Sequence, residues 1–169
     1  YASAGVASST GIAAELFRSL SGGALQMIPH RGLPEANTSV LRGDTQLGFT
    51  FFAVGGDLIR AGQLRALAVT GSQRLPVLPD VPTYAELGIK GYEDMIFNGV
   101  FAPAGTPANL IESYSTAITK VVKSADFVEK LAALGINAQA GSAADLNARL
   151  KATQDFSANM VKNAGYKPQ

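Results

Sequence analysis

Three consecutive hydroxyl residues, Ser8, Ser9 and Thr10, separate a glycine-containing turn from an amphipathic run. The first N–H groups of a helix have no intrahelical acceptor, and the helix dipole places partial positive charge there. Together with the hydroxyls, these N–H groups could hold a carboxylate or a phosphate. Small residues just before them, Ala4 and Ala7, would let a ligand approach the backbone. Since Ser and Thr are also the preferred N-caps of any helix, the local pattern alone favours simple capping.

Two further stretches place polar or aromatic side chains at the ends of predicted strands. His30-Arg31-Gly32 follows a short apolar run, and Thr50-Phe51 ends a run with strand propensity. If the strands are parallel, both stretches lie at the same carboxyl edge as the opening turn, where α/β folds bind ligands. At such a site Arg31 could supply a positive charge for an anionic ligand. Thr50 could supply a polar group, and Phe51 an aromatic wall. The plainer alternatives are a solvated arginine, a histidine in a turn and ordinary strand packing.

Several kinds of chemistry are excluded or unsupported. The chain has no cysteine and one histidine, so thiolate sites, disulfides and multi-histidine metal sites are excluded. Nucleophile-elbow, Walker and dinucleotide-binding motifs are absent, and we expect no catalytic residue, metal or cofactor. A small α/β enzyme that uses His30 as its base stays open as an alternative, and it requires a second titratable group beside that ring.

Composition allows one sizeable domain or two small lobes. The 169 residues are 47% apolar and 16% charged with a net charge of +1, which gives no electrostatic reason to expect nucleic acid as a partner. No apolar stretch is long enough to predict a transmembrane helix, and no signal peptide is recognisable.

Predicted strands alternate with predicted helices up to about residue 103, which indicates a mostly parallel sheet with helices on its faces. Strands are expected at 1–4, 25–29, 45–52, 64–70 and within 92–103. Helices are expected at 10–20, within 30–44 with Ala36, Val40 and Leu41 on one face, and at 55–63. A short helix should begin at the capping box Thr83–Glu86. Beyond the boundary we expect three helices, the first capped by Thr106 with Pro107 at its first position and the last capped by Ser142. The predicted domains are therefore residues 1–102 and 103–169.

Several stretches together resemble one protein family. They read YASAGVASSTGIAAELF, IPHRG, AGQLRALAVTGSQRLPVLPDVPTYAELGIKGYE, GVFAPAGTP and, at the end, VKNAGYKPQ. This set resembles the solute-binding proteins of the tripartite tricarboxylate transporters, often called Bug-type receptors. The resemblance spans the whole chain but somewhat more than half of a family member, from its C-terminal end.

The resemblance implies an α/β fold of the periplasmic binding protein type II-like (Venus flytrap) class, with a parallel-rich sheet and flanking helices. The first of its two lobes would be largely missing here. It implies a periplasmic receptor in which each lobe grips a small carboxylate with a loop, partly through water and backbone N–H groups. It also implies that the ligand passes to the membrane permease subunits of the transporter.

The opening turn resembles the second lobe's ligand loop, which commonly reads Y-A-S-S-G-N-G-T-S. Ala4, Val6 and Ala7 stand where the family usually has serine, asparagine and glycine, so backbone and hydroxyl donors must carry more of the binding. The usual F-D-N appears as Phe49-Thr50-Phe51, which weakens the expectation that a ligand ammonium is recognised and leaves room for an aromatic or apolar carboxylate.

Combining the residues with the resemblance, we expect a carboxylate-binding site formed by residues of the opening turn and the two strand ends. They are Ser3, Ala4, Gly5, Val6, Ala7, Ser8, Ser9, Thr10, His30, Arg31, Thr50 and Phe51. A sensor or structural module of the same fold that no longer binds is a further alternative.

An apolar stripe on the predicted helix 110–122 would lack the sheet on which it packs in the family. We expect this segment either to repack on itself or to cover the stripe against another chain, because large exposed apolar patches are rare in soluble monomers. Self-association would use Leu110, Tyr114, Ile118 and Val121.

Overall fold

A short parallel sheet lies at the centre of the compact half of the protein. β1 (Ala2–Ser3) pairs in parallel with β2 (Ile28–Pro29), and on the other side of β1 the residue Ala2 forms a parallel bridge to Gly48. Because the chain runs in the same direction through β1, β2 and Gly48, the residues that follow these three segments lie at one common edge. The computed structural model describes residues 1–5, 8–22, 24–92 and 97–163.

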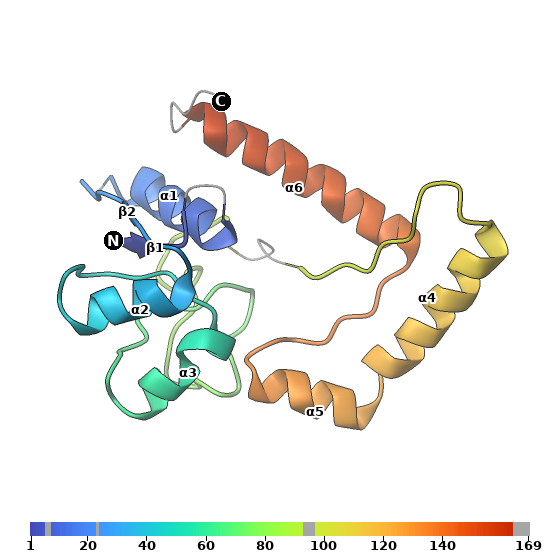
Figure 1. The fold of residues 1–169 in the computed structure, drawn as a ribbon, viewed down its shortest axis with the longest axis horizontal. Helices are drawn as coiled ribbons and strands as arrows, with labels where there is room; N and C mark the ends of the chain where they lie inside the picture. Colours follow the sequence, from blue (N-terminus) through green and yellow to red (C-terminus); the bar gives the residue numbers. More distant parts are fainter. Residues whose placement is uncertain (6–7, 23, 93–96, 164–169) are drawn as a thin grey trace.

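A helix follows each of the three segments. They are α1 (Ser9–Ser21), α2 (Leu33–Leu41) and α3 (Phe52–Arg60). Figure 1 shows them clustered around the sheet, with α2 in contact with both β1 and α3. This alternation is the arrangement that a parallel pairing requires, since parallel strands need a crossover connection.

The segment from residue 61 to 92 contains turns in place of regular elements. The capping box is present, because Thr83 N–H donates to the Glu86 carboxylate at 2.7 Å and Glu86 N–H donates to Thr83 Oγ1 at 3.2 Å. Arg74 also pairs with this carboxylate at 2.9 Å. The Arg74 hydrogen bond, assisted by the Thr83 N–H, lowers the pKa of Glu86 to about 2.

Tyr92 is the centre of the hydrophobic core. Its side chain is 1% exposed and packs with Ala13 and Leu16 of α1. The Tyr92 hydroxyl donates to the Ala13 carbonyl, and the ring stacks on Tyr84 with centroids 4.1 Å apart. Burial raises the pKa of the Tyr92 phenol. Phe156, from the last helix, packs against the same cluster and so joins the end of the chain to its beginning.

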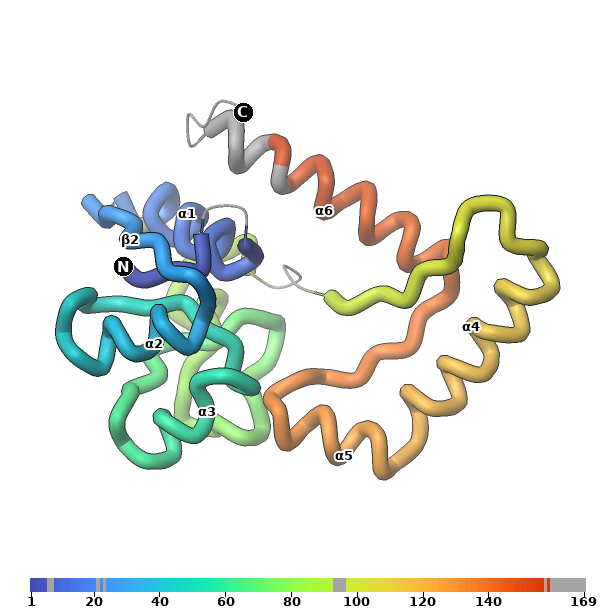
Figure 2. Tube along the Cα trace, viewed as in Figure 1, coloured from blue at the N-terminus to red at the C-terminus, as the bar shows by residue number. Residues whose placement is uncertain are grey.

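The last third of the chain forms an open arm. α4 (Ala108–Val122) and α5 (Ala125–Ala133) extend away from the compact half, and α6 (Ala143–Asn163) returns to contact α1 (Figures 1 and 2). Neither α4 nor α5 contains a buried residue. Within the described residues, no helix combines the length and apolar character that crossing a bilayer requires.

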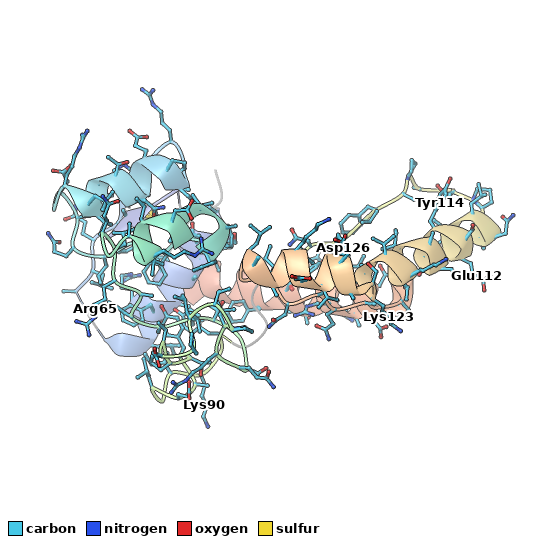
Figure 3. All side chains as sticks on the ribbon, turned by 90° about the horizontal axis from the view of Figure 1, so that it is seen from below. Arg65, Lys90, Glu112, Tyr114, Lys123 and Asp126 are labelled. Atoms are coloured by element: carbon cyan, nitrogen blue, oxygen red, sulfur yellow. The ribbon has the colours of Figure 1, made fainter. Side chains whose placement is uncertain are left out.

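The expected apolar stripe of α4 lies uncovered along this arm. Tyr114, labelled in Figure 3, is 54% exposed, and the other three stripe residues range from 37 to 52%. The segment has therefore not repacked on itself, which removes one of the two expected outcomes.

α5 meets α3 at one tight contact. Gly135 follows α5 with a φ of +71°, and a Cβ placed on it would lie 2.9 Å from Phe52 Cβ. Arg60 crosses the same place, with its guanidinium 4.9 Å from the Phe52 ring centre and 3.4 Å from the Ala133 carbonyl oxygen. Glycine is required at position 135 because both the backbone angle and the close approach exclude a side chain.

The sheet is smaller than the sequence predicted. The expected strand 45–52 is reduced to the bridge at Gly48, and 64–70 to a bridge between Val69 and Thr83. The expected strand 25–29 is confirmed only for Ile28–Pro29, and both of these residues are exposed. Residues 97–103 do not form a strand, and residues 93–96 lie outside the described part. Strand propensity alone does not supply the neighbouring strands that a ladder needs.

Three predicted helix starts also differ. α3 begins at Phe52, although the sequence predicted a helix from residue 55 to 63. Thr106 does not cap α4, because its hydroxyl donates to the Pro103 carbonyl and Pro107 takes the N-cap position. Residues 84–87 form turns where a short helix was expected after the capping box. The cap of α6 is confirmed, since Ser142 Oγ accepts from Asp145 N–H at 3.2 Å.

Candidate functional site

The predicted anion cradle lies at the N-terminus of α1. Ser8 is the N-cap, and its Oγ accepts from Gly11 N–H at 3.0 Å while donating to the Gly5 carbonyl at 2.6 Å. Gly5 has a φ of +104°, which turns the chain from β1 into the helix. The first turn of α1 contains no acidic residue, so no side-chain carboxylate of its own competes for the positive end of the dipole.

The three hydroxyls of the opening turn have different roles. Ser8 is occupied as the cap, and Thr10 is 5% exposed with its Oγ1 3.1 Å from Ser8 Oγ. Ser9 is exposed at the first helical position. Because Gly11 N–H is used by the cap, the N–H groups of Ser9 and Thr10 are those left for an anion. Predicted site residues Val6 and Ala7 lie outside the described residues.

His30 and Arg31 follow β2 at the same edge. His30 N–H donates to the Ser3 carbonyl at 2.8 Å, which brings the two strand ends together as the sequence predicted. The His30 Nε2 atom is buried and has no hydrogen-bond partner in the described part of the chain. Arg31 is exposed, and its N–H donates to the Glu35 carboxylate at 2.9 Å. Among the described residues, no carboxylate therefore forms a hydrogen bond with His30 Nε2.

Thr50 and Phe51 lead into α3 at this edge. Phe51 is the N-cap residue of α3, which begins with no side-chain cap. Thr50 Oγ1 is buried and has no hydrogen-bond partner among the residues described. Both residues are partly buried, and they follow Gly48, the bridge partner of Ala2, by two and three positions.

Sequence reasoning missed Asn37, which lies beside Thr50. The predicted apolar face of this helix was Ala36, Val40 and Leu41, yet Asn37 is 4% exposed and Leu41 is 40% exposed. Asn37 Nδ2 is buried with no partner within the described residues. No signal in the sequence distinguishes this asparagine from an exposed one, because its burial results from the packing of α2 on α3.

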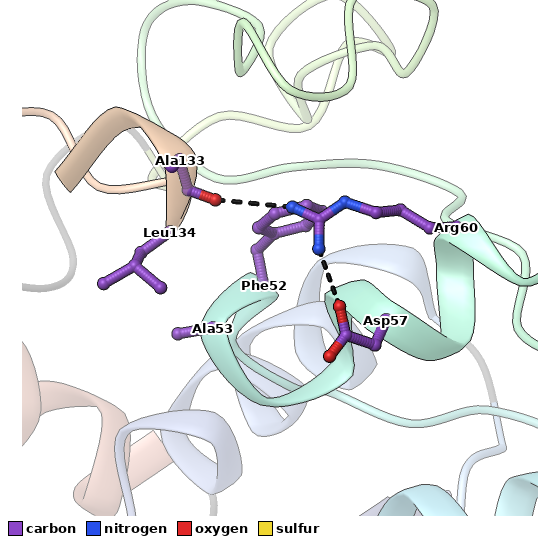
Figure 4. Close-up of a pocket in the computed structure, with 6 residues that line it drawn as sticks. All are labelled: Phe52, Ala53, Asp57, Arg60, Ala133 and Leu134. Carbon is purple, nitrogen blue, oxygen red and sulfur yellow. Dashed lines mark hydrogen bonds and ion pairs between the residues drawn. The ribbon is translucent and has the colours of Figure 1, made fainter. Parts of the chain in front are cut away.

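A separate pocket lies between α3 and α5 (Figure 4). Phe52, Ala53, Asp57, Arg60, Ala133 and Leu134 line it. Arg60 is already paired with Asp57 at 2.7 Å and bonded to the Ala133 carbonyl, so it is not available to a carboxylate. No group of three acidic or histidine side chains suited to a metal ion occurs in the part of the chain that the structure describes.

Comparison with known proteins agrees with this arrangement. The sequence pattern of the tripartite tricarboxylate transporter family receptors, TctC, matches residues 1–166. A relative from Pseudomonas sp. strain P51, a UPF0065 protein in the tcbD-tcbE intergenic region, is 36% identical over 84% of this chain and 43% of its own length. The chain thus spans about half the length of the relatives it matches.

Two solved structures share the fold over essentially the whole chain. The R. palustris protein Rpa4515 with adipate has a TM-score of 0.85 and 28% identity, covering 100% of this chain and 56% of that one. The periplasmic binding protein BugD has a TM-score of 0.79 and 27% identity, covering 99% and 57%. The expected fold class is confirmed: an α/β periplasmic binding protein fold with parallel strand pairing and flanking helices.

Proposed function

The chain belongs to the tripartite tricarboxylate transporter receptor family, and from this premise we propose that it forms the ligand-gripping lobe of a two-lobed receptor for a small organic carboxylate. Residues 1–102 are the lobe, and residues 103–169 are the segment that packs on the other lobe. The receptor works outside the cytoplasm, in the periplasm, and delivers its ligand to membrane permease subunits. It is a binding protein and has no catalytic step.

The observation that carries this proposal is the N-terminus of α1. Its first turn contains no acid, its cap is a serine, and the N–H groups of Ser9 and Thr10 face no acceptor among the described residues. A carboxylate placed there accepts these hydrogen bonds and neutralises the positive end of the helix. The Ser3 carbonyl holds His30 beside this turn, and the edge continues to Thr50.

The solved relative that contains adipate supports a carboxylate as the ligand class. Closure of two lobes around the carboxylate would exclude water and strengthen the N–H contacts. Val6 and Ala7, which complete the loop, and Phe51, which supplies an apolar wall, belong to the same proposed site.

A thermal-shift screen of mono-, di- and tricarboxylates on the two-lobed receptor tests the proposal. We expect at least one carboxylate to raise the melting temperature, because a ligand that binds only the native state stabilises it. The variant Ser9→Leu should weaken calorimetric binding of that ligand by about tenfold or more, since its bulk covers the free N–H groups. Ser19→Leu is the matched control, because Ser19 is an exposed serine near the opposite end of α1.

Two results would overturn the proposal. Unchanged affinity in Ser9→Leu would remove the α1 cradle from the site. A stable receptor that takes up no carboxylate would favour the alternative of a module that keeps the fold without binding. The other alternative is an enzyme that uses His30 as its base. It is not supported, because His30 Nε2 has no hydrogen-bond partner among the described residues.

We also propose that the 169-residue chain alone self-associates through α4. Leu110, Tyr114, Ile118 and Val121 form one exposed apolar stripe, and water contact with such a stripe is unfavourable. Light scattering after size exclusion should show a dimer or larger species. Tyr114→Glu should shift it towards monomer, whereas Thr116→Glu, on the other side of α4, should not. A monomer at all concentrations would refute this proposal.

A further inference from the structure

The segment 97–102, which connects the compact half to α4, runs alongside α6 (Figures 1 and 2). The Phe97 ring centre lies 5.5 Å from the guanidinium carbon of Arg149. A Cβ placed on Gly99 would lie 3.1 Å from Leu146 Cδ1, so the backbone of the segment approaches the helix closely there. One face of residues 97–102 is therefore packed on α6.

The backbone of this segment is unpaired. Phe97 and Gly99 are partly buried, while Asn98 and Val100 are exposed, which is the period of two that a strand with one packed face shows. Among the described residues, no backbone hydrogen bond involves residues 97–102. A strand whose N–H and carbonyl groups are unpaired is a template on which another chain can pair.

The segment also lacks the features that protect a free strand edge. Natural proteins blunt such edges with charged side chains, proline or a bulge, but residues 97–102 read FNGVFA and contain neither a charge nor a proline. Val100 is 70% exposed and Phe101 is 65% exposed, more than any other large apolar side chain that the structure describes. These features are typical of a strand that has a partner.

The exposed surface leaves room for a protein partner. The chain exposes 11154 Å², whereas a compact monomer of its mass, 17.5 kDa, exposes about 7,900 Å². The surplus, roughly 3,300 Å², exceeds the roughly 1,000–2,500 Å² that each partner buries in a large permanent dimer. Helices α4 and α5, which contain no buried residue, lie on the same arm.

A second copy of the chain fits this edge. Two identical strands can pair antiparallel about a two-fold axis, because each copy then uses the same residues. Residues 97–102 are uncharged and the net charge of the chain is +1, so little charge repulsion opposes the approach of two copies. The segment leads into α4, so the strand edge and the exposed stripe of α4 belong to one continuous stretch of chain.

We propose that residues 97–102 pair antiparallel with the same residues of a second copy, which forms a β ladder in the dimer interface. Such pairing rests on the proposed self-association through α4. The stripe of α4 supplies apolar burial, and the ladder fixes how the two copies are oriented. Val100 and Phe101 become covered in the dimer.

Amide hydrogen exchange of the 169-residue chain tests the ladder without any substitution. Spectra are compared at concentrations above and below the dissociation constant of the dimer. We expect alternate amides of residues 97–102 to exchange about 100-fold more slowly in the dimer, because only one edge of each strand is paired. In the monomer these amides should exchange rapidly.

Two proline variants test the same point by light scattering. Successive N–H groups of a strand point to opposite edges, so one of Val100→Pro and Phe101→Pro removes an N–H from the paired edge. That variant should raise the dissociation constant of the dimer by roughly tenfold or more, since two-fold symmetry removes the hydrogen bond twice. Val100→Ala and Phe101→Ala keep the N–H and measure the share of each side chain.

Gln139→Pro is the matched control. Gln139 is an exposed residue in the segment between α5 and α6, and no backbone hydrogen bond of this residue occurs among the described residues. This variant should leave the dissociation constant unchanged.

The outcomes separate the ladder from the proposed self-association. If the chain dimerises while the amides of residues 97–102 exchange as rapidly as in the monomer, the ladder is refuted and the α4 proposal stands. Unchanged dissociation constants in both Val100→Pro and Phe101→Pro refute the ladder as well, and leave the edge to the other lobe of the receptor. A chain that stays monomeric at all concentrations refutes the self-association and the ladder together.

Discussion

The substitution Ser8→Ala tests how the opening turn is held. Ser8 Oγ makes two hydrogen bonds that this change removes, one from Gly11 N–H at 3.0 Å and one to the Gly5 carbonyl at 2.6 Å. Loss of a serine N-cap costs about 1 kcal/mol, and loss of a further neutral hydrogen bond costs about 1 kcal/mol. The Gly5 carbonyl keeps the Ser8 N–H at 3.2 Å, so it is not left unpaired.

We therefore expect Ser8→Ala to lower the free energy of unfolding by about 2 kcal/mol. For a chain of this size, that corresponds to a melting temperature lower by about 4–8 °C. Urea unfolding followed by the helical circular dichroism signal measures the change, with an unchanged slope showing that both proteins unfold alike. Ser8→Thr retains the hydroxyl and should lie within about 0.5 kcal/mol of the natural protein.

The reasoning is refuted if Ser8→Ala unfolds at the same urea concentration as the natural protein. It is also refuted if Ser8→Thr is as destabilising as Ser8→Ala, because the hydroxyl would then not be the stabilising group.

Two other predictions concern contacts away from the cradle. Gly135→Ala should destabilise by more than about 1 kcal/mol in urea unfolding, since its φ is +71° and its Cβ would lie 2.9 Å from Phe52 Cβ; Gly62→Ala, at a φ of +69° with open space, should cost less. As pH falls from about 4.5 towards about 2, Glu86 stays ionised in the native state while the unfolded chain binds the proton, so the stability from its Arg74 pairing is progressively lost. In Glu86→Gln the urea midpoint of unfolding should change less with pH over that interval. An unchanged dependence of the midpoint on pH in this variant would contradict the role given to the Glu86–Arg74 pair.

The helices that local sequence defines could be predicted well. α1 begins within one residue of its predicted start because Ser8 caps it and Gly22 ends it with a φ of +61°. The cap of α6 at Ser142 was likewise predicted. These features depend on residues a few positions apart, so they are readable without knowledge of the rest of the fold.

The strands could not be predicted to the same degree. Residues 45–52 have strand propensity, but only Gly48 pairs with β1, because β1 is only two residues long. A ladder depends on a partner distant in sequence, and propensity reports only how a residue fits a pleated surface once that partner is present.

The candidate site was predictable in its location and less so in its composition. The order of strands and helices placed His30 and Thr50 at the edge of the opening turn, as the structure has them. The division of roles among Ser8, Ser9 and Thr10 required the hydrogen bonds themselves. The buried Asn37 required the packing of α2 against α3, which no local pattern encodes.

The backbone amide NMR spectrum of the two-lobed receptor, recorded with and without saturating adipate, tests the central claim most directly. A carboxylate held at the N-terminus of α1 accepts hydrogen bonds from the N–H groups of Ser9 and Thr10, so these signals should show the largest downfield shifts. Largest shifts at Ala53 and Leu134, in the separate pocket between α3 and α5, with Ser9 and Thr10 unmoved, would contradict the account.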